Sequence, residues 1–283
     1  MIPERVGEWL QQQGHGAVVG QHAVSGGCIN NGARLETASG ASFFLKTNNS
    51  APEQLFTREA EGLAALSQAS GPRFPQAYLW GEEFLLLEDL APAPRAANYW
   101  ERLGRQLAQL HSHTNRQFGF GHDNYLGSTP QPNPWTADGF AFFAEQRLGF
   151  QARLARDQGR LSRAEAAQVE RLGTRLPDLV PRQPAALIHG DLWGGNAISD
   201  SRGGPALIDP AAHYGWPEAE LGMTALFGGF DPLFYVAYEE ERALDKGWRQ
   251  RLPLYNLYHL LNHLNLFGEG YHGQVKQVLE EFA

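Results

Sequence analysis

Apolar and polar residues alternate in short runs over the first 90 residues, and glycine, serine or asparagine bounds most of these runs. Such alternation is typical of strands that have one buried face. Strands are predicted at residues 17–24, 33–37, 42–47, 77–81 and 84–90. A short amphipathic helix is predicted for residues 1–14, and a second helix, with proline near its first turn, for 52–68. We therefore expect residues 17–90 to form a five-stranded sheet that carries one helix.

The pattern changes after residues 91–98, which are rich in proline and alanine. Helical periodicity then dominates, at residues 98–113, 136–157, 162–176, 218–228, 233–243, 252–267 and 271–282. Residues 186–210 interrupt it and indicate loop, strand, turn and strand. Residues 114–135 contain too many Gly, Pro and Asn for a regular element, so an ordered, functional loop is expected there. The chain is predicted to divide into domains 1–90 and 91–283.

Composition and charge narrow the class of protein. The 283 residues are 42% apolar, enough for a sizeable core, and the net charge is −8 without any basic tract. A nucleic-acid or membrane partner is therefore not expected. The chain has no run long enough to cross a bilayer, and its N-terminus lacks the apolar run of a signal peptide. Cys28 is the only cysteine, so no internal disulfide can form. We expect a cytoplasmic protein, as a monomer or a weak homodimer.

The strongest chemical signal is His189-Gly190-Asp191, followed by Asn196 and Asp209. Phosphoryl transfer needs a carboxylate beside the attacking hydroxyl and oxygen ligands for the Mg²⁺ that bridges the phosphates. The sequence can supply one such carboxylate and two metal ligands. They are a loop aspartate, an asparagine five residues later and a strand-ending aspartate thirteen residues beyond it, which is the spacing of protein-kinase-like folds. Asp191 is then the catalytic residue, and Asn196 and Asp209 are the metal ligands. The alternative is a polar turn followed by an unrelated aspartate.

Lys46 is one of only three lysines, and it lies in the apolar strand 42–47, where alternation would bury its ammonium group. An unpaired buried ammonium is costly, so a partner is required. In a kinase the partners would be the α- and β-phosphates of ATP and a glutamate of the next helix, Glu59 or alternatively Glu61. The competing interpretations are an edge-strand lysine facing solvent and glutamates on a solvated helix face.

Two further segments would complete a nucleotide site. The glycine-rich turn at residues 25–31 lies between two predicted strands, where backbone amides could close over phosphates. Residues 88–90 would form the hinge beside the adenine. The additional nucleotide-binding residues are Gly26, Gly27, Cys28, Glu88, Asp89 and Leu90. Cys28 would be either a buried inert thiol or a partly exposed one whose oxidation blocks or dimerises the protein.

Several segments strongly resemble the fructosamine kinase (ketosamine-3-kinase) family. They are GGCIN upstream of FFLK, DNYLGSTPQPNPW, HGDLWGGN followed by ALIDPA, and YHLLNHLNLFGEGY, in the family's order from about residue 24 to 271. The HGD…N…D pattern is shared with aminoglycoside and choline kinases, whereas Trp193 and NYLGSTPQPN are more particular. The resemblance implies an α+β, bilobal protein-kinase-like fold. Its N-terminal lobe is a small antiparallel sheet with one helix, and its C-terminal lobe is larger and mainly helical.

The resemblance also implies ATP- and Mg²⁺-dependent phosphorylation of the sugar 3-hydroxyl of ketosamines, small or protein-bound, as a deglycation step. Trp193 and His263 are then expected near the substrate. The alternatives are a tryptophan that plugs the catalytic loop and a satisfied core histidine. Glu220 is expected to bond the catalytic-loop backbone. Glycine at position 190, where many protein kinases carry arginine, and Pro-Ala after Asp209 both fit a kinase without phosphorylation control.

Two other functions share part of this pattern. An aminoglycoside- or choline-type kinase would need a deep acidic pocket or an aromatic cage. Glutamates and an aspartate between residues 218 and 241 could supply the acidic pocket, although such charges usually form a solvated face. A nucleotide-binding pseudokinase would lack Lys46, Asp191 or a metal ligand, and all of these are present.

Overall fold

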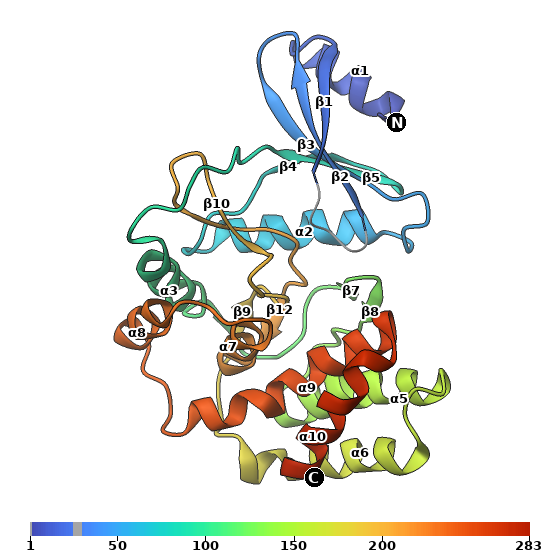
Figure 1. Cartoon of the computed structure of the whole chain (residues 1–283), viewed down its shortest axis with the longest axis vertical. Helices are drawn as coiled ribbons and strands as arrows, with labels where there is room; N and C mark the ends of the chain where they lie inside the picture. The colour runs from blue at the N-terminus through green and yellow to red at the C-terminus, as the bar shows by residue number, and fades with distance from the viewer. Residues whose placement is uncertain (1, 25–29) are drawn as a thin grey trace.

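The N-terminal part is an antiparallel sheet of five strands in the computed structural model, which describes residues 2–24 and 30–283 (Figure 1). The strand order is β1-β2-β3-β5-β4. The strands are β1 (Val18–Val24), β2 (Asn31–Thr37), β3 (Ser42–Thr47), β4 (Ala77–Trp80) and β5 (Phe84–Glu88). All five predicted strands are confirmed. The expected alternation is clearest in β2, where Ala33, Leu35 and Thr37 are buried and the residues between them are partly exposed.

Two helices cover this sheet on opposite faces. Helix α1 (Glu4–Gln12) packs with Leu86 of β5, whereas helix α2 (Leu55–Gln68) packs with Leu85 and Leu87. Successive residues of a strand point to opposite faces, so the two helices cannot share a side. Helix α2 begins three residues later than predicted, since Gln54 has a left-handed backbone with φ of 61°. The face covered by α2 also carries Lys46, one residue after Leu45 of the α1 face.

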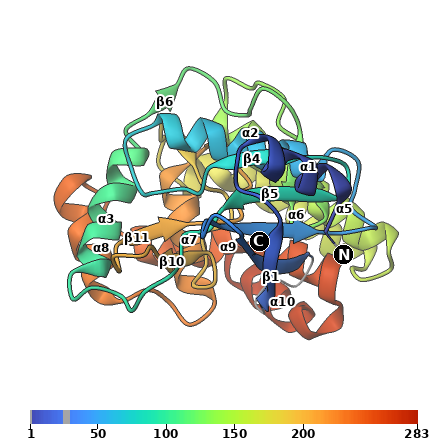
Figure 2. The same cartoon turned by 90° about the horizontal axis from the view of Figure 1, so that it is seen from above.

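The C-terminal part is mainly helical, as predicted. Helices α3 (Tyr99–Leu110) and α8 (Pro232–Glu241) lie side by side at one end of it, in both views (Figures 1 and 2). The remaining helices are α4 (Gly139–Phe142), α5 (Phe150–Asp157), α6 (Arg163–Leu179), α7 (Pro217–Leu226), α9 (Trp248–Phe267) and α10 (His272–Phe282). A short 3-10 turn, Glu269–Tyr271, joins the last two.

Three predicted segments differ in detail. The helix expected at 136–157 contains a π-helical stretch, Phe143–Gly149, between α4 and α5. Residues 114–135 are not wholly irregular, because they include β6 (Thr114–Asn115), β7 (Asn124–Leu126) and β8 (Thr129–Gln131). Residues 185–215 form β9 (Ala185–Ile188), β10 (Ala197–Ser199), β11 (Pro205–Leu207) and β12 (His213–Gly215). Strands β10 and β11 confirm the strand, turn and strand predicted within residues 186–210. Strands β6 to β9 and β12 were not predicted, because strands of two to four residues leave almost no periodic signal.

One apolar core runs through both parts of the molecule. It joins Phe56 of α2 and Leu85 of β5 to Leu103 of α3 and Leu207 of β11. The packing does not stop at residue 90. The division into domains at that residue stays a prediction. None of the helices in residues 2–24 and 30–283 is long and apolar enough to cross a membrane.

Candidate active site

A cavity of about 870 Å³ lies where the sheet meets the helical part. That volume is in the range of small-ligand sites. Lys46 of β3 and Glu59 of α2 line it from the N-terminal side. Asp191, Asn196 and Asp209 line it from the segment between β9 and β12. The predicted catalytic residue, the predicted metal ligands and the Lys46–Glu59 pair are thus brought into one cavity.

Lys46 is buried and paired with two carboxylates. Its Nζ contacts Glu59 Oε1, and it donates a hydrogen bond of 2.5 Å to Asp209 Oδ1. Burial alone would lower the pKa of this ammonium, but the charges of Asp209 and Glu59 raise it above its usual value. Glu61, the alternative partner, lies instead beside Arg58 and His122, at 2.7 and 2.9 Å. The contact predicted for Glu59 is present, and the solvent-facing alternative for Lys46 is wrong.

Asp191 and Asn196 are held together on the loop that follows β9. The Asn196 Nδ2 donates to the backbone oxygen of Asp191 at 2.8 Å and to the carboxylate Oδ2 of Asp191 at 3.3 Å. Both bonds use Nδ2, so they leave the amide oxygen of Asn196 available to a metal. Burial, and next the charge of Asp209, raise the pKa of Asp191 to about 7. A carboxylate with a pKa near neutrality suits the acceptance of a proton from a substrate hydroxyl.

Glu220 of α7 supports the catalytic loop from behind. It accepts hydrogen bonds from the backbone nitrogens of His189, at 2.9 Å, and Gly190, at 2.7 Å. On its other side, His111 Nε2 lies 3.0 Å from the same carboxylate, and His111 Nδ1 lies 2.7 Å from the hydroxyl of Tyr238. Burial would raise the pKa of Glu220, but the bond from His111 lowers it. The predicted structural role of Glu220 is confirmed; His111 and Tyr238 gave no sequence signal.

The backbone explains why glycine stands at position 190. Gly190 has a left-handed φ of 85°, and a Cβ there would lie 2.2 Å from the carbonyl oxygen of Ala211. A side chain is therefore excluded. The neighbouring His189 Nε2 lies 2.8 Å from the carbonyl oxygen of Ile208, the residue before Asp209. The loop that carries Asp191 and the segment that carries Asp209 are thus fastened to each other.

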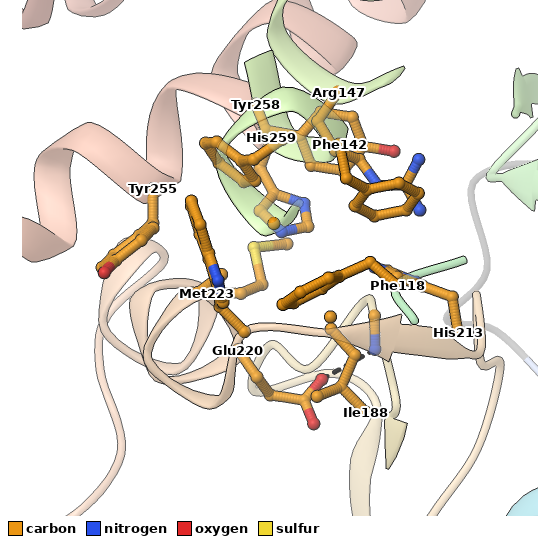
Figure 3. A pocket seen from close by; sticks show the side chains of 16 residues that line it. Phe118, Phe142, Arg147, Ile188, His213, Glu220, Met223, Tyr255, Tyr258 and His259 are labelled. Carbon is orange, nitrogen blue, oxygen red and sulfur yellow. Dashed lines mark hydrogen bonds between the residues drawn. The ribbon is translucent and has the colours of Figure 1, made fainter. Parts of the chain in front are cut away.

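A second cavity, much smaller, lies behind this loop (Figure 3). Its volume of about 20 Å³ is enough for one water molecule and excludes a substrate. Phe142, Tyr258 and His259 surround it together with Arg147, whose guanidinium carbon lies 4.4 Å from the Phe142 ring centre. It is a packing gap among buried rings, so the large cavity is the candidate active site.

The predicted hinge residues, 88–90, line the large cavity, but the carboxylates of Glu88 and Asp89 form ion pairs with arginines. Glu88 contacts Arg73, and Asp89 lies 2.6 Å from the Arg34 side chain. Leu90 is buried. Main-chain contact with a nucleotide, as predicted, remains compatible with this arrangement. The other nucleotide-side residues, Gly26, Gly27 and Cys28, lie outside the described residues.

Trp193 and His263 both line the cavity on the side of α7 and α9. His263 is half-buried, and its Nδ1 lies 2.8 Å from the His259 carbonyl oxygen, so it is not fully enclosed in the core. Three aromatic residues that sequence reasoning did not select line the same side: Phe227, Phe267 and Tyr271. The aromatic spacing of LNLFGEGY was the only hint of Phe267 and Tyr271, and Phe227 gave no signal in the sequence.

The donor set fits one kind of metal site. Within the described part of the chain, His, Cys, Asp and Glu side chains do not form a group of three or more that could hold a metal ion. The oxygens of Asp209 and Asn196 are nevertheless the hard ligands that Mg²⁺ prefers, and Mg²⁺ is commonly bound by one or two carboxylates together with substrate phosphates. The site is therefore suited to a metal that arrives with a nucleotide.

The fold matches that of known small-molecule kinases. The choline kinase of Streptococcus pneumoniae superposes with a TM-score of 0.67 at 14% identity, over 99% of this chain and 98% of that one. At such low identity the match shows the fold alone. It confirms the predicted protein-kinase-like architecture.

The comparisons with closer relatives cover nearly the whole chain. The family profile described as fructosamine kinase matches residues 1–283. A candidate ketoamine kinase of Synechocystis is 43% identical over 92% of this chain and 89% of its own length. The chloroplastic protein-ribulosamine 3-kinase of Arabidopsis thaliana is 36% identical over 100% of this chain and 88% of its own.

A solved structure agrees with these relatives. The crystal structure of a candidate fructosamine-3-kinase from Thermobifida fusca is 35% identical, with a TM-score of 0.87 and 97% coverage of both chains. The sequence, the fold and the cavity thus lead to one assignment: this chain belongs to the fructosamine kinase family, phosphotransferases that act on a sugar hydroxyl.

Proposed function

We propose that the protein transfers the γ-phosphoryl group of ATP to the 3-hydroxyl of a ketosamine, with Mg²⁺ as the metal. The observation that carries this proposal is the meeting of Lys46, Asp191, Asn196 and Asp209 in one cavity. Names of relatives, ketoamine kinase and protein-ribulosamine 3-kinase, support the acceptor class. The product would be a ketosamine 3-phosphate.

Each side chain has a distinct role in this proposal. Asp191 orients the acceptor hydroxyl and accepts its proton, for which its raised pKa is suited. Asn196 and Asp209 would hold Mg²⁺, which neutralises the charge on the phosphates when it is bound. Lys46, which pairs with Glu59 of α2 and with Asp209, would contact the phosphates in place of Asp209 and keep Glu59 as its partner. Glu220 holds the backbone of the loop in place.

The charges around the cavity disfavour an aminoglycoside as acceptor. A site for several ammonium groups needs several carboxylates, and the candidates between residues 218 and 241 are used elsewhere. Glu218 pairs with Arg251 at 2.7 Å, and Glu240 and Glu241 pair with Arg105 on the surface. Among the described residues that line the cavity, α7, α9 and residues 268–271 contribute no carboxylate. Ring faces line that side instead, which suits a single ammonium beside a sugar.

Two aspartate variants test the assignment. Asp191→Asn should lower kcat by ~10²–10⁴-fold or more, because the proton acceptor is lost, while the affinity for Mg-ATP is kept. Asp209→Asn should lower kcat and also weaken Mg-ATP binding, since a metal ligand becomes neutral. Steady-state assays with fructosyl- and ribulosyl-lysine derivatives, kanamycin and choline, together with calorimetric titration of Mg-ATP, separate these effects. Near-normal turnover by Asp191→Asn, or turnover of kanamycin or choline alone, would contradict the proposal.

A further inference from the structure

A continuous row of aromatic rings leads from the catalytic loop to the end of α9 and the turn that follows it. Trp193, two residues after Asp191, meets Phe227 with ring centres 6.5 Å apart, and Phe227 meets His263 at 4.8 Å. His263 then contacts Tyr271 at 5.0 Å and Phe267 at 5.4 Å. All five line the cavity, so the row forms one wall of it.

The outer end of this wall is an apolar ring that is exposed to solvent. Phe267, the last residue of α9, leaves 49% of its surface accessible, although the inner rings are at least half-buried. Gly268 follows with a φ of 89°, which ends the helix and lets residues 269–271 turn back. Tyr271 is thereby brought beside Phe267, with ring centres 6.3 Å apart. Exposed aromatic surface that continues a ligand cavity is a mark of a binding surface.

Charge and chemistry indicate what this surface would bind. In a ketosamine, the amine nitrogen lies close along the carbon chain to the hydroxyl that accepts the phosphate. With the sugar at Asp191 and Trp193, the row that continues from Trp193 to Phe227 gives the amine and its carrier a wall to lie along. The carboxylates among the described lining residues belong to α2, to β5 and the residue after it, and to the catalytic segment, so this wall offers ring faces rather than fixed negative charge. Ring faces attract a secondary ammonium and an apolar carrier.

We propose that Phe227, Phe267 and Tyr271 form a subsite for the amine carrier, which selects ketosamines whose carrier presents an apolar or aromatic group next to the nitrogen. This inference rests on the proposed function and adds the specificity of the same site. Phe267 is the specificity-determining residue, because it is the exposed end of the wall.

The experiment compares two ketosamines that share the sugar and differ in the carrier, fructosyl-benzylamine and fructosyl-ethanolamine. Wild-type protein should favour the benzylamine adduct in kcat/KM by about tenfold, the effect of a few extra apolar atoms in a pocket. Phe267→Ala should remove most of that preference, chiefly by raising KM for the benzylamine adduct. Phe267→Trp should restore it.

Trp80→Ala is the matched control, because Trp80 is an exposed aromatic residue, 38% accessible, that does not line the cavity. It should leave both rates unchanged. Equal losses on both adducts in Phe267→Ala, or no loss on either, would overturn the subsite while leaving the proposed function intact. If wild-type protein phosphorylated neither these adducts nor their ribulosyl counterparts, the proposed function and the subsite would fall together.

Discussion

Buried histidines surround the catalytic loop, and burial keeps them neutral. Burial, followed by the charges of His263 and Arg147, lowers the pKa of His259 to about 3. The pKa of His213 is lowered well below its usual range, again mainly by burial. A histidine that cannot accept a proton when folded makes folding dependent on pH, since the unfolded chain can accept one.

The substitution His259→Gln isolates this effect. Between pH 7.5 and pH 5, the unfolded wild-type chain gains a proton at His259 that the folded protein does not bind. The stability of the wild type relative to the variant should therefore fall by about 2 kcal/mol over this range. Urea unfolding of both proteins at the two pH values measures the change. His22→Gln, at an exposed position, is the control, and a pH-independent gap between wild type and His259→Gln would contradict the prediction.

The residues that carry chemistry were largely predictable, because a lysine is rare in an apolar strand and because Asp191, Asn196 and Asp209 follow a recognisable spacing. Lys46 and Glu59 are in the predicted contact, and Asp191, Asn196 and Asp209 share one cavity with them. The residues that hold them were not predictable. His111 reaches Glu220 across 109 residues of chain, and a single sequence carries no sign of such a distant contact.

At the scale of elements, the short hairpin β7–β8 is held in place by hydrogen bonds of buried side-chain amides, because its two three-residue strands make few backbone hydrogen bonds. Asn133, which is 1% exposed, donates to Asn124 Oδ1 at 2.8 Å and accepts from Arg147 Nη2 at 2.7 Å. Gln131 donates to the same Asn124 oxygen at 2.7 Å. The hairpin also reaches the start of α2. The Tyr125 hydroxyl donates at 2.9 Å to the backbone oxygen of Glu53, two residues before the helix, and β7 packs against α2. It thus connects the helical part to the helix that carries Glu59.

Asn133→Ala should destabilise the protein by about 2 kcal/mol, because the buried Arg147 guanidinium loses one of its acceptors and Asn124 Oδ1 loses one of its two donors. Chemical denaturation measures the loss. The exposed Asn115 of β6 provides the comparison, and Asn115→Ala should change stability by no more than about 0.5 kcal/mol. Equal stability of the two variants would show that the amide network does not hold the hairpin.

This network also shows where element prediction stopped. The Gly, Pro and Asn content of residues 114–135 correctly indicated few regular elements, but three-residue strands that depend on side-chain amides have no periodic signature. The π-helical stretch Phe143–Gly149 has helical periodicity in sequence, and only its hydrogen bonding distinguishes it. The long helices and the five-stranded sheet were predictable because their burial pattern repeats over several turns or strands.

At the scale of the whole molecule, the shared core sets how the protein unfolds. Phe56 and Leu85 from the sheet side pack in one cluster with Leu103 and Leu207 from the helical side. Separation of the two parts would expose this apolar surface, at a cost of about 25 cal/mol for each Å². We therefore expect the sheet and the helical part to lose their structure together.

Thermal or urea unfolding should accordingly show one cooperative transition. Far-UV circular dichroism follows mainly the helical part, and fluorescence of a variant that retains only Trp9 would follow the sheet side, where Trp9 packs on Phe43. The two midpoints should coincide. Two separate transitions would instead support independent domains at 1–90 and 91–283.

The pairing of Lys46 with Glu59 and Asp209 has one more consequence. A free divalent cation would have to displace an ammonium from Asp209 and leave that ammonium with a single counterion in a buried site. A metal–nucleotide complex brings phosphate oxygens to receive the ammonium as it moves. Under the proposed function, Mg²⁺ without nucleotide should be a poor occupant, and metal and nucleotide should enter together as one unit.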